Sequence, residues 1–89
     1  MKIDFTSIEV PISFDGTTQR YNIAEPLGNG MMFNGSIIAD IGFEELAKEI
    51  YYSKGEVEVP SKYAPFIVRI VMDSTFPASI KRYIRDNLK

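Results

Sequence analysis

The chain contains no cysteine and no histidine. Without cysteine it can form neither a disulfide framework nor a thiolate metal site, and it has no cysteine nucleophile. Histidine is the commonest general base and the commonest ligand of transition metals, so its absence removes Ser-His-Asp catalysis and histidine-bearing zinc sites. The bases that remain are carboxylates, lysines and tyrosines. We therefore expect a protein that is not an enzyme and that uses no cofactor and no metal.

Long apolar stretches are also missing. The longest one, Tyr63 to Met72, is interrupted by Pro65 and Arg69, and its ten residues are too few to span a bilayer. Residues 1–5 contain no apolar core of a signal peptide. The sequence thus predicts a soluble, cytoplasmic protein that does not bind membranes.

The composition that remains is that of a small globular domain. The chain has 89 residues, 45% hydrophobic and 25% charged, which is typical of a folded domain with one core. We expect residues 1–89 to form a single domain. The net charge is −2, but residues 1–60 carry −6 and residues 61–89 carry +4. Such an asymmetry can steer a partner or favour head-to-tail contacts between copies.

A β-hairpin is the first element that the sequence predicts. Asp15-Gly16 favours a two-residue type I′ turn, in which both central residues have positive φ. This turn sets the cross-strand partners, which are Ile8–Ile23, Val10–Tyr21 and Ile12–Gln19. With Phe14 they would form one apolar face opposite a polar face. Because Ile3 and Phe5 are in the opposite phase, we predict a bulge or a break at Thr6-Ser7.

The segment of residues 25–39 gives a less regular prediction. Glu25-Pro26 can open a helix that has proline at its first position. Gly28, Gly30 and Gly35 each weaken a helix by about 1 kcal/mol relative to alanine. We expect a short, loose helix or a turn-rich segment.

Apolar residues at helical spacing predict three further helices. Their expected ranges are Ile41 to Ser53 with Asp40 as N-cap, Pro60 to about Met72, and Phe76 to Leu88. The inner stripe of the first comprises Ile41, Leu46, Ile50 and Tyr51, and that of the last comprises Ile80, Ile84 and Leu88. The β-branched run 66–72 is also compatible with a strand. We favour a helix because the run is apolar on nearly every side, as in a central buried helix.

Glu56 to Val59 alternates between acidic and apolar residues, which predicts a short strand. The elements together predict an α+β fold. In it, an N-terminal antiparallel β-hairpin, joined by this short third strand, packs against about three helices.

Two local patterns resemble ligand sites but have simpler explanations. Gly28-Asn29-Gly30 lacks the third glycine of a dinucleotide loop, since Phe33 stands there, and no Gly-Lys-Ser or Gly-Lys-Thr follows. Glu45 and Glu49 are i,i+4 neighbours that could share a hard cation. Acidic residues early in a helix also complement the helix dipole. We predict neither a nucleotide site nor a metal site.

Two surfaces are candidates for a function. The chain has many large apolar residues for a small core, and exposed apolar clusters usually mark an interface. For an apolar contact we select Tyr52, Tyr63 and Phe66. The last helix carries a basic face of Lys81, Arg82, Arg85 and Lys89, of which Arg82 and Arg85 are the candidates for contact with an acidic partner. A solvated helix end is the simpler interpretation of this basic face.

The layout resembles a group of short proteins of bacterial prophages and mobile elements. The shared features are a hairpin followed by Leu27-Gly28-Asn29, Asp40-Ile41-Gly42, Ala47-Lys48-Glu49-Ile50-Tyr51 and Glu56-Val57-Glu58-Val59, then two helices. The resemblance brings no catalytic or binding motif, and it implies a small accessory or assembly protein.

The sequence therefore predicts a non-enzymatic protein–protein interaction or assembly module. We expect it to bind a protein partner or itself, as a homo-oligomer. The alternative is a nucleic-acid accessory or regulatory protein that uses the basic last helix. The acidic balance of the whole chain argues against nucleic acid as the main partner.

Overall fold

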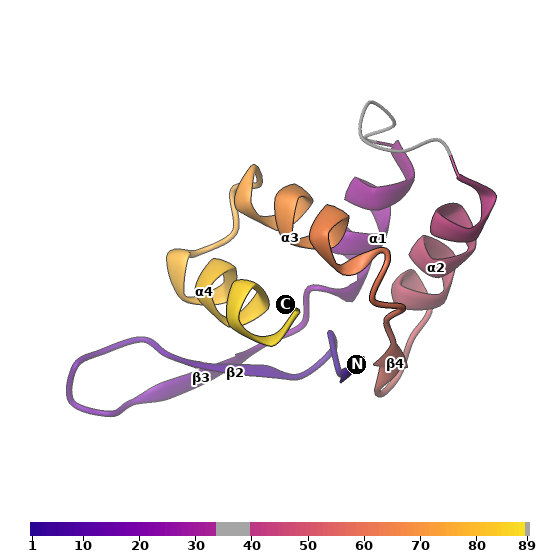
Figure 1. The fold of residues 1–89 in the computed structure, drawn as a ribbon. Coiled ribbons are helices and arrows are strands. Elements are labelled where there is room, and N and C mark those ends of the chain that lie inside the picture. Colours follow the sequence, from indigo (N-terminus) through magenta and orange to yellow (C-terminus); the bar gives the residue numbers. More distant parts are fainter. Residues whose placement is uncertain (34–39, 89) are drawn as a thin grey trace.

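A computed structural model describes residues 1–33 and 40–88 of the chain. Within this part it contains four short strands and four helices (Figure 1). The strands are β1 (Lys2–Ile3), β2 (Ile8–Pro11), β3 (Thr18–Tyr21) and β4 (Val57–Glu58). The helices are α1 (Ala24–Phe33), α2 (Ile41–Tyr51), α3 (Ala64–Met72) and α4 (Ala78–Asn87). The predicted α+β class is confirmed. Across the described ranges, no helix has both the length and the apolar character needed to cross a membrane.

β2 and β3 form the predicted hairpin, but their register differs from the prediction by two residues. Ile8 pairs with Tyr21 and Val10 with Gln19, where the type I′ turn would have paired them with Ile23 and Tyr21. A shift of two residues keeps every side chain on its own face of the ladder. Ile8 and Val10 are accordingly buried as predicted.

The turn explains the shift in register. Gly16 has a φ of 93°, but Asp15 has no positive φ, so a type I′ turn does not form. The chain instead closes a four-residue loop, residues 13–16, and the Ile12 N–H donates to the Thr17 carbonyl at 2.9 Å. The Asp15 carboxylate accepts from the Thr17 N–H at 2.9 Å and from its hydroxyl at 2.6 Å. We call residues 13–16 the hairpin loop.

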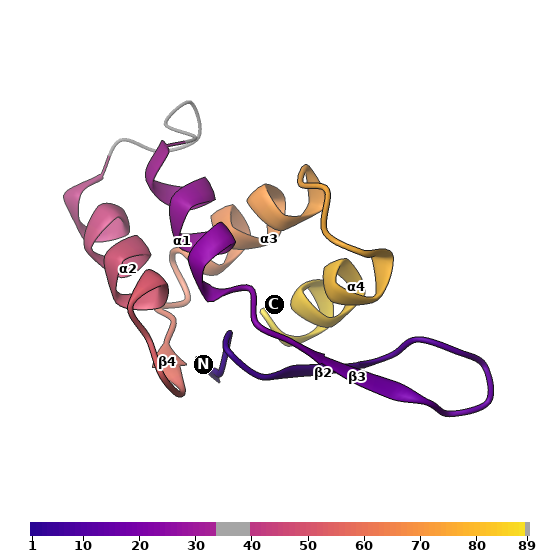
Figure 2. The same cartoon turned by 180° about the vertical axis from the view of Figure 1, so that it is seen from behind.

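The outer half of the hairpin projects from the rest of the molecule (Figures 1 and 2). Every residue from 11 to 20 is exposed. The buried part of the apolar face predicted for the hairpin therefore ends at Val10, and Ile12 and Phe14 beyond it are exposed. Helix α4 packs against β2 but does not extend as far as the loop (Figure 2), so Ile12 is half exposed and Phe14 is fully exposed.

The third strand, β4, pairs with β1 and not with the hairpin. Lys2 lies opposite Glu58 and Ile3 opposite Val57, in antiparallel orientation. The break predicted at Thr6-Ser7 separates β1 from β2. There the Asp4 carboxylate accepts hydrogen bonds from the Thr6 N–H at 2.9 Å and from the Thr6 hydroxyl. This turn leads the chain from one two-stranded sheet into the other.

α1 is a complete helix of ten residues, more regular than predicted. The Asn22 side chain accepts from the Ala24 N–H at 3.1 Å at its start. Its Gly28 lies against α2, where a Cβ would come within 2.7 Å of the Tyr51 Cβ and 2.9 Å of the Ala47 carbonyl oxygen. The glycine therefore allows α1 and α2 to pack closely. The later part of the predicted segment, residues 34–39 with Gly35, lies outside the described residues.

Asp40 is the N-cap of α2, as predicted, and its carboxylate accepts from the Gly42 N–H at 2.7 Å. Leu46 and Ile50 are buried on the predicted face, but Ile41 at the start of the helix is exposed. At about 100° per residue, Ile41 lies on the opposite side of α2 from the buried Ile50, so its side chain remains in solvent. The expected contribution of Ile41 to the core was therefore wrong.

Residues 66–72 are helical, which decides between the helix and the strand. The helix begins at Ala64 because residues 61–63 form a turn. It is not buried on every side, since Pro65, Arg69 and Met72 form an exposed stripe at positions i, i+4 and i+7. The last helix, α4, buries its predicted inner stripe of Ile80, Ile84 and the following Leu88.

The buried side chains of the helices and strands form one hydrophobic cluster. Its largest fully buried members include Phe5, Leu27, Ile50, Ile67 and Ile80, which come from five different parts of the chain. Among the described residues no polar side chain is buried. Apolar contacts therefore dominate the core.

Candidate interaction surfaces

The three residues selected for an apolar contact lie in different environments. Tyr52 is 75% exposed at the end of α2, Phe66 is partly buried on α3, and Tyr63 is only 5% exposed. The Tyr63 ring lies edge-on to Phe43 with centroids 5.4 Å apart, and its hydroxyl donates to the Asp40 carboxylate at 3.0 Å. Tyr63 is thus a core residue that stabilises the start of α2. The structure does not bring the three residues together on one surface.

The same contacts affect the charge of Asp40. Hydrogen bonds from the Tyr63 hydroxyl and the Gly42 N–H hold the pKa of the Asp40 carboxyl below its ordinary value. The carboxylate therefore stays ionised at neutral pH, as an N-cap acceptor should at the positive end of a helix.

An open groove of about 280 Å³ lies along one flank of the contact between α1 and α2. We call it the α1–α2 groove. Its lining residues are Gly28, Asn29, Met32 and Phe33 of α1, together with Ala47, Lys48, Tyr51 and the following Tyr52 of α2. Of the three aromatic residues, Phe33 is 79% exposed, and the rings of Tyr51 and Tyr52 lie edge-to-face at 4.8 Å. Of the selected residues, Tyr52 alone lines this groove.

Sequence reasoning did not identify Phe33 as part of the site. Met31, Met32 and Phe33 form a run of large apolar residues at the end of a helix. Met31 is buried, whereas Phe33 remains in solvent. The signal that could have found the groove is Gly28, because a small residue on a helix face marks a close approach to a neighbour. That approach places Tyr51 and Tyr52 next to the end of α1.

The helix that forms one side of the groove is mainly acidic. Asp40, Glu44, Glu45 and Glu49 lie on α2 or at its N-cap, against one basic residue, Lys48. Lys48 lines the groove, and its ammonium lies 3.8 Å from the Glu44 carboxylate. The groove thus combines aromatic and thioether groups with one amine at its edge.

The other two selected residues, Arg82 and Arg85, are exposed on α4 together with the partly buried Lys81. The Arg85 Nε lies 3.0 Å from the Asp86 carboxylate, which reduces the local positive charge. Arg82 borders a smaller depression of about 180 Å³ between α4 and β2. Lys89, the fourth member of the predicted basic face, lies outside the described residues.

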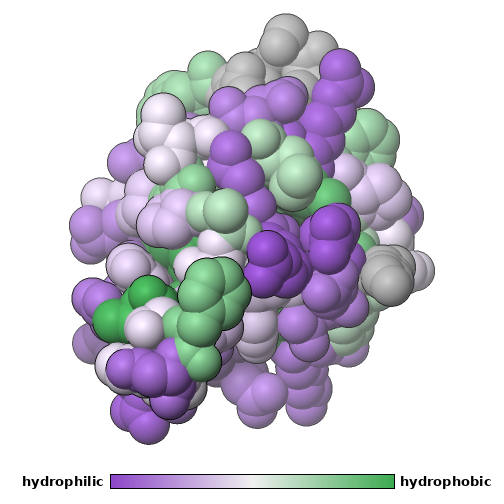
Figure 3. Space-filling view, turned by 90° about the vertical axis from the view of Figure 1, so that its left-hand side faces the viewer, coloured by the Kyte–Doolittle hydropathy of each residue, from purple (hydrophilic) through white to green (hydrophobic). Residues whose placement is uncertain are grey.

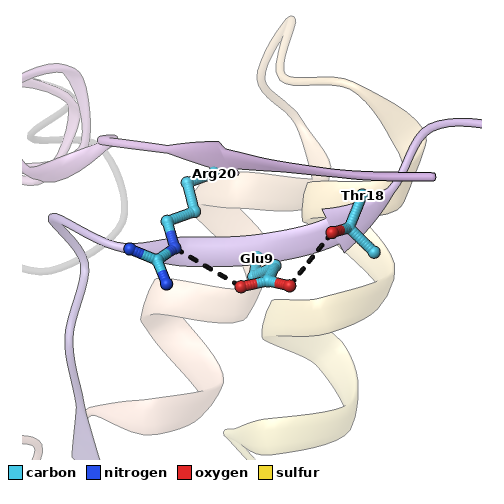
Figure 4. A network of polar contacts seen from close by, with 3 residues as sticks. All are labelled: Glu9, Thr18 and Arg20. Carbon is cyan, nitrogen blue, oxygen red and sulfur yellow. Dashed lines mark hydrogen bonds and ion pairs between the residues drawn. The ribbon is translucent and has the colours of Figure 1, made fainter.

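The hairpin is held in shape on its exposed face by a polar network around Glu9 (Figure 4). The Glu9 carboxylate accepts from the Thr18 hydroxyl at 3.0 Å and from the Arg20 Nε at 3.3 Å. These two hydrogen bonds lower the pKa of Glu9. The network connects β2 to β3 where the hairpin leaves the core.

The hairpin loop carries the most exposed aromatic residue of the described chain. The Phe14 side chain is fully exposed at 113%, and Ile12 next to the loop is half exposed. Figure 3 views the molecule from this end and shows hydrophobic atoms on the nearest surface, low in the view where the hairpin lies. An exposed cluster of this kind is a typical mark of a contact surface.

The α1–α2 groove is lined mainly by apolar groups. In the part of the chain that the structure describes, no three acidic side chains gather in a way that could hold a metal ion. The groups that line the α1–α2 groove are apolar or aromatic, apart from one amide and one amine. Such a groove can accept an apolar side chain and place a carboxylate beside Lys48.

In comparisons with known proteins, no family model, no curated protein and no solved structure matches the chain.

Proposed function

We propose that this protein is a non-enzymatic protein–protein interaction or assembly module whose contact surface is the α1–α2 groove. The observation that carries the proposal is that two large aromatic side chains, Phe33 and Tyr52, remain exposed beside this groove while the core is closed without them. Aromatic residues and methionine are enriched in protein interfaces. The partner is another protein or a second copy of the chain, in agreement with the expected homo-oligomer.

A photo-crosslinking amino acid at position 52, introduced in the native host, tests this proposal. The expected result is a covalent adduct with a protein. An adduct whose mass is a multiple of the monomer mass identifies the partner as a second copy of the chain. The matched control carries the same amino acid at Thr75, an exposed position between α3 and α4. If position 52 gives no more adduct than position 75, the groove is not a contact surface.

Binding of nucleic acid through α4 has less support from the geometry. Arg85 is paired with Asp86, and Arg82 is the other exposed arginine on this face. Nucleic-acid binding would weaken steeply with salt because phosphate counterions are released. A gel shift at low salt distinguishes the two functions, and we expect no discrete complex with duplex DNA.

A further inference from the structure

The molecule has two chemically different ends. It measures 43 Å along its longest axis and 24 by 20 Å across. Helix α2 with the α1–α2 groove lies at one end, and α4 with the projecting hairpin lies at the other (Figures 1 and 2). Each end carries an exposed aromatic group that the core does not use, Tyr52 at the first and Phe14 at the second.

The hairpin loop presents Phe14 in a defined conformation. The Asp15 carboxylate accepts two hydrogen bonds from Thr17, and the Asp15 N–H donates to the Ser13 hydroxyl at 3.4 Å. These contacts hold the loop without help from the core. A side chain on an ordered loop loses less conformational entropy when it binds than one on a loose segment. Phe14 is thus suited to insertion into an apolar groove.

The charges of the two ends are complementary. Helix α2 and its N-cap carry four acidic residues against Lys48, with Lys62 close to Asp40, whereas α4 carries two arginines and one lysine against Asp86 and the hairpin adds Glu9, Asp15 and Arg20. The α2 end is therefore net negative and the α4 end net positive. Two copies will therefore attract each other when the α4 end of one faces the α2 end of the other. Pairing of groove with groove would bring two acidic α2 helices together and is disfavoured for the same reason.

The same complementarity holds close to the contact residues. Asp15 follows Phe14 directly in the hairpin loop, and the hydrogen bonds from Thr17 lower the pKa of its carboxyl, so it is ionised at neutral pH. Lys48 is the one cationic residue that lines the groove. A Phe14 side chain in the groove would bring the Asp15 carboxylate toward this amine.

From these observations we infer that the α1–α2 groove of one copy binds Phe14 in the hairpin loop of a second copy. The inference rests on the proposed function of the groove and names its occupant. The contact is heterologous, since a pair of copies still has one free loop and one free groove, and it generates a ring or an open chain of copies. Few residues take part, so the buried area falls at the low end for protein interfaces and the association depends strongly on concentration.

The test uses two single variants of the full chain, Phe14→Ser in the loop and Tyr52→Ser in the groove. Light scattering after size exclusion measures the mass of each over about 10 to 500 µM, the range of weak protein contacts. Wild type should grow in mass with concentration, and each variant alone should remain monomeric. An equimolar mixture of the two should form a one-to-one dimer and nothing larger. The mixture combines one intact loop with one intact groove.

Ile41→Ser is the matched control, because Ile41 is an exposed apolar residue of α2 that does not line the groove. It should associate like wild type. Circular dichroism of all three variants should show unchanged folding, since none of the substituted residues is buried. Raising the salt from about 50 to about 500 mM should weaken the wild-type association because it screens the two charged ends.

Three results would overturn the inference. These are a wild type that stays monomeric over the whole range, a Phe14→Ser variant that associates like wild type, and a mixture that forms no dimer. If Tyr52→Ser prevents association and Phe14→Ser does not, the groove is a contact surface but its occupant is not the loop. The proposed function then stands. The proposed function itself fails through the separate crosslinking experiment at position 52.

Discussion

Replacement of Gly28 by alanine tests the close packing of α1 on α2. Helix propensity alone predicts that Gly28→Ala stabilises the protein by about 1 kcal/mol. The structure predicts the opposite sign. A Cβ at this position would lie 2.7 Å from the Tyr51 Cβ and 2.9 Å from the Ala47 carbonyl oxygen, well inside the ordinary contact distance of about 3.5 Å. Both atoms belong to the α2 helix and cannot swing away.

The two helices must therefore move apart, and overpacking of this kind costs about 1–3 kcal/mol. After the gain in propensity, we expect Gly28→Ala to lower the free energy of unfolding by about 1 kcal/mol. Gly30 is the matched control on the same helix. A Cβ there would lie 3.5 Å from the Ile70 Cγ2, an ordinary contact, so Gly30→Ala should stabilise by about 1 kcal/mol.

Urea unfolding followed by far-UV circular dichroism measures both variants against wild type. The expected result is a lower midpoint for Gly28→Ala and a higher midpoint for Gly30→Ala, with similar slopes. The reasoning is refuted if both substitutions raise the midpoint to the same extent. That outcome would mean that α1 does not rest on α2 through Gly28.

Three further predictions concern the core and the start of α2. Phe5→Ala should lower the free energy of unfolding by about 3–5 kcal/mol, because this ring is fully buried. Phe14→Ala, in the loop, should change the free energy of unfolding by less than about 0.5 kcal/mol. Equal effects of the two substitutions in urea unfolding would contradict the fold. Tyr63→Phe removes one hydrogen bond to Asp40 and should cost about 1 kcal/mol in the same assay; an unchanged midpoint would show that this bond contributes nothing. Because hydrogen bonds lower the pKa of Asp40 in the folded state, the carboxylate stabilises the protein above about pH 4 and this contribution is lost as the pH falls through the folded pKa. Urea midpoints across this range should therefore depend less on pH in Asp40→Asn than in wild type, and equal pH dependence would rule out the assignment.

Features set by neighbours in sequence could be predicted before the structure. Asp40 caps a helix through the N–H two residues later, and Ile80, Ile84 and Leu88 share a face because of the helical repeat. The break at Thr6-Ser7 could be predicted because the apolar residues before it alternate in the opposite phase from those after it. Each of these depends on interactions within a few residues, and such interactions leave a pattern in the sequence.

Features set by distant partners could not be predicted in this way. Asp15-Gly16 fits both a two-residue turn and a four-residue loop, and both keep Ile8 on the buried face, so alternation does not choose between them. The partner of β4 is β1, more than fifty residues earlier. Tyr63 was selected for an apolar contact because it belongs to a surplus of large apolar residues, but it is buried and its hydroxyl donates to an acceptor 23 residues away, in Asp40.

The exposed aromatic residues should contribute to association and not to the stability of the fold. Phe14, Phe33 and Tyr52 are each at least 75% exposed, and full burial of such a side chain is worth roughly 1.5–3 kcal/mol. These side chains do not contribute this free energy to folding, because none of them belongs to the hydrophobic core. Substitutions at the three positions should therefore alter association without altering unfolding, whereas substitutions at Phe5 or Gly28 should alter unfolding first. A variant at Tyr52 that lost both stability and association would place this side chain in the fold and remove it from the contact surface.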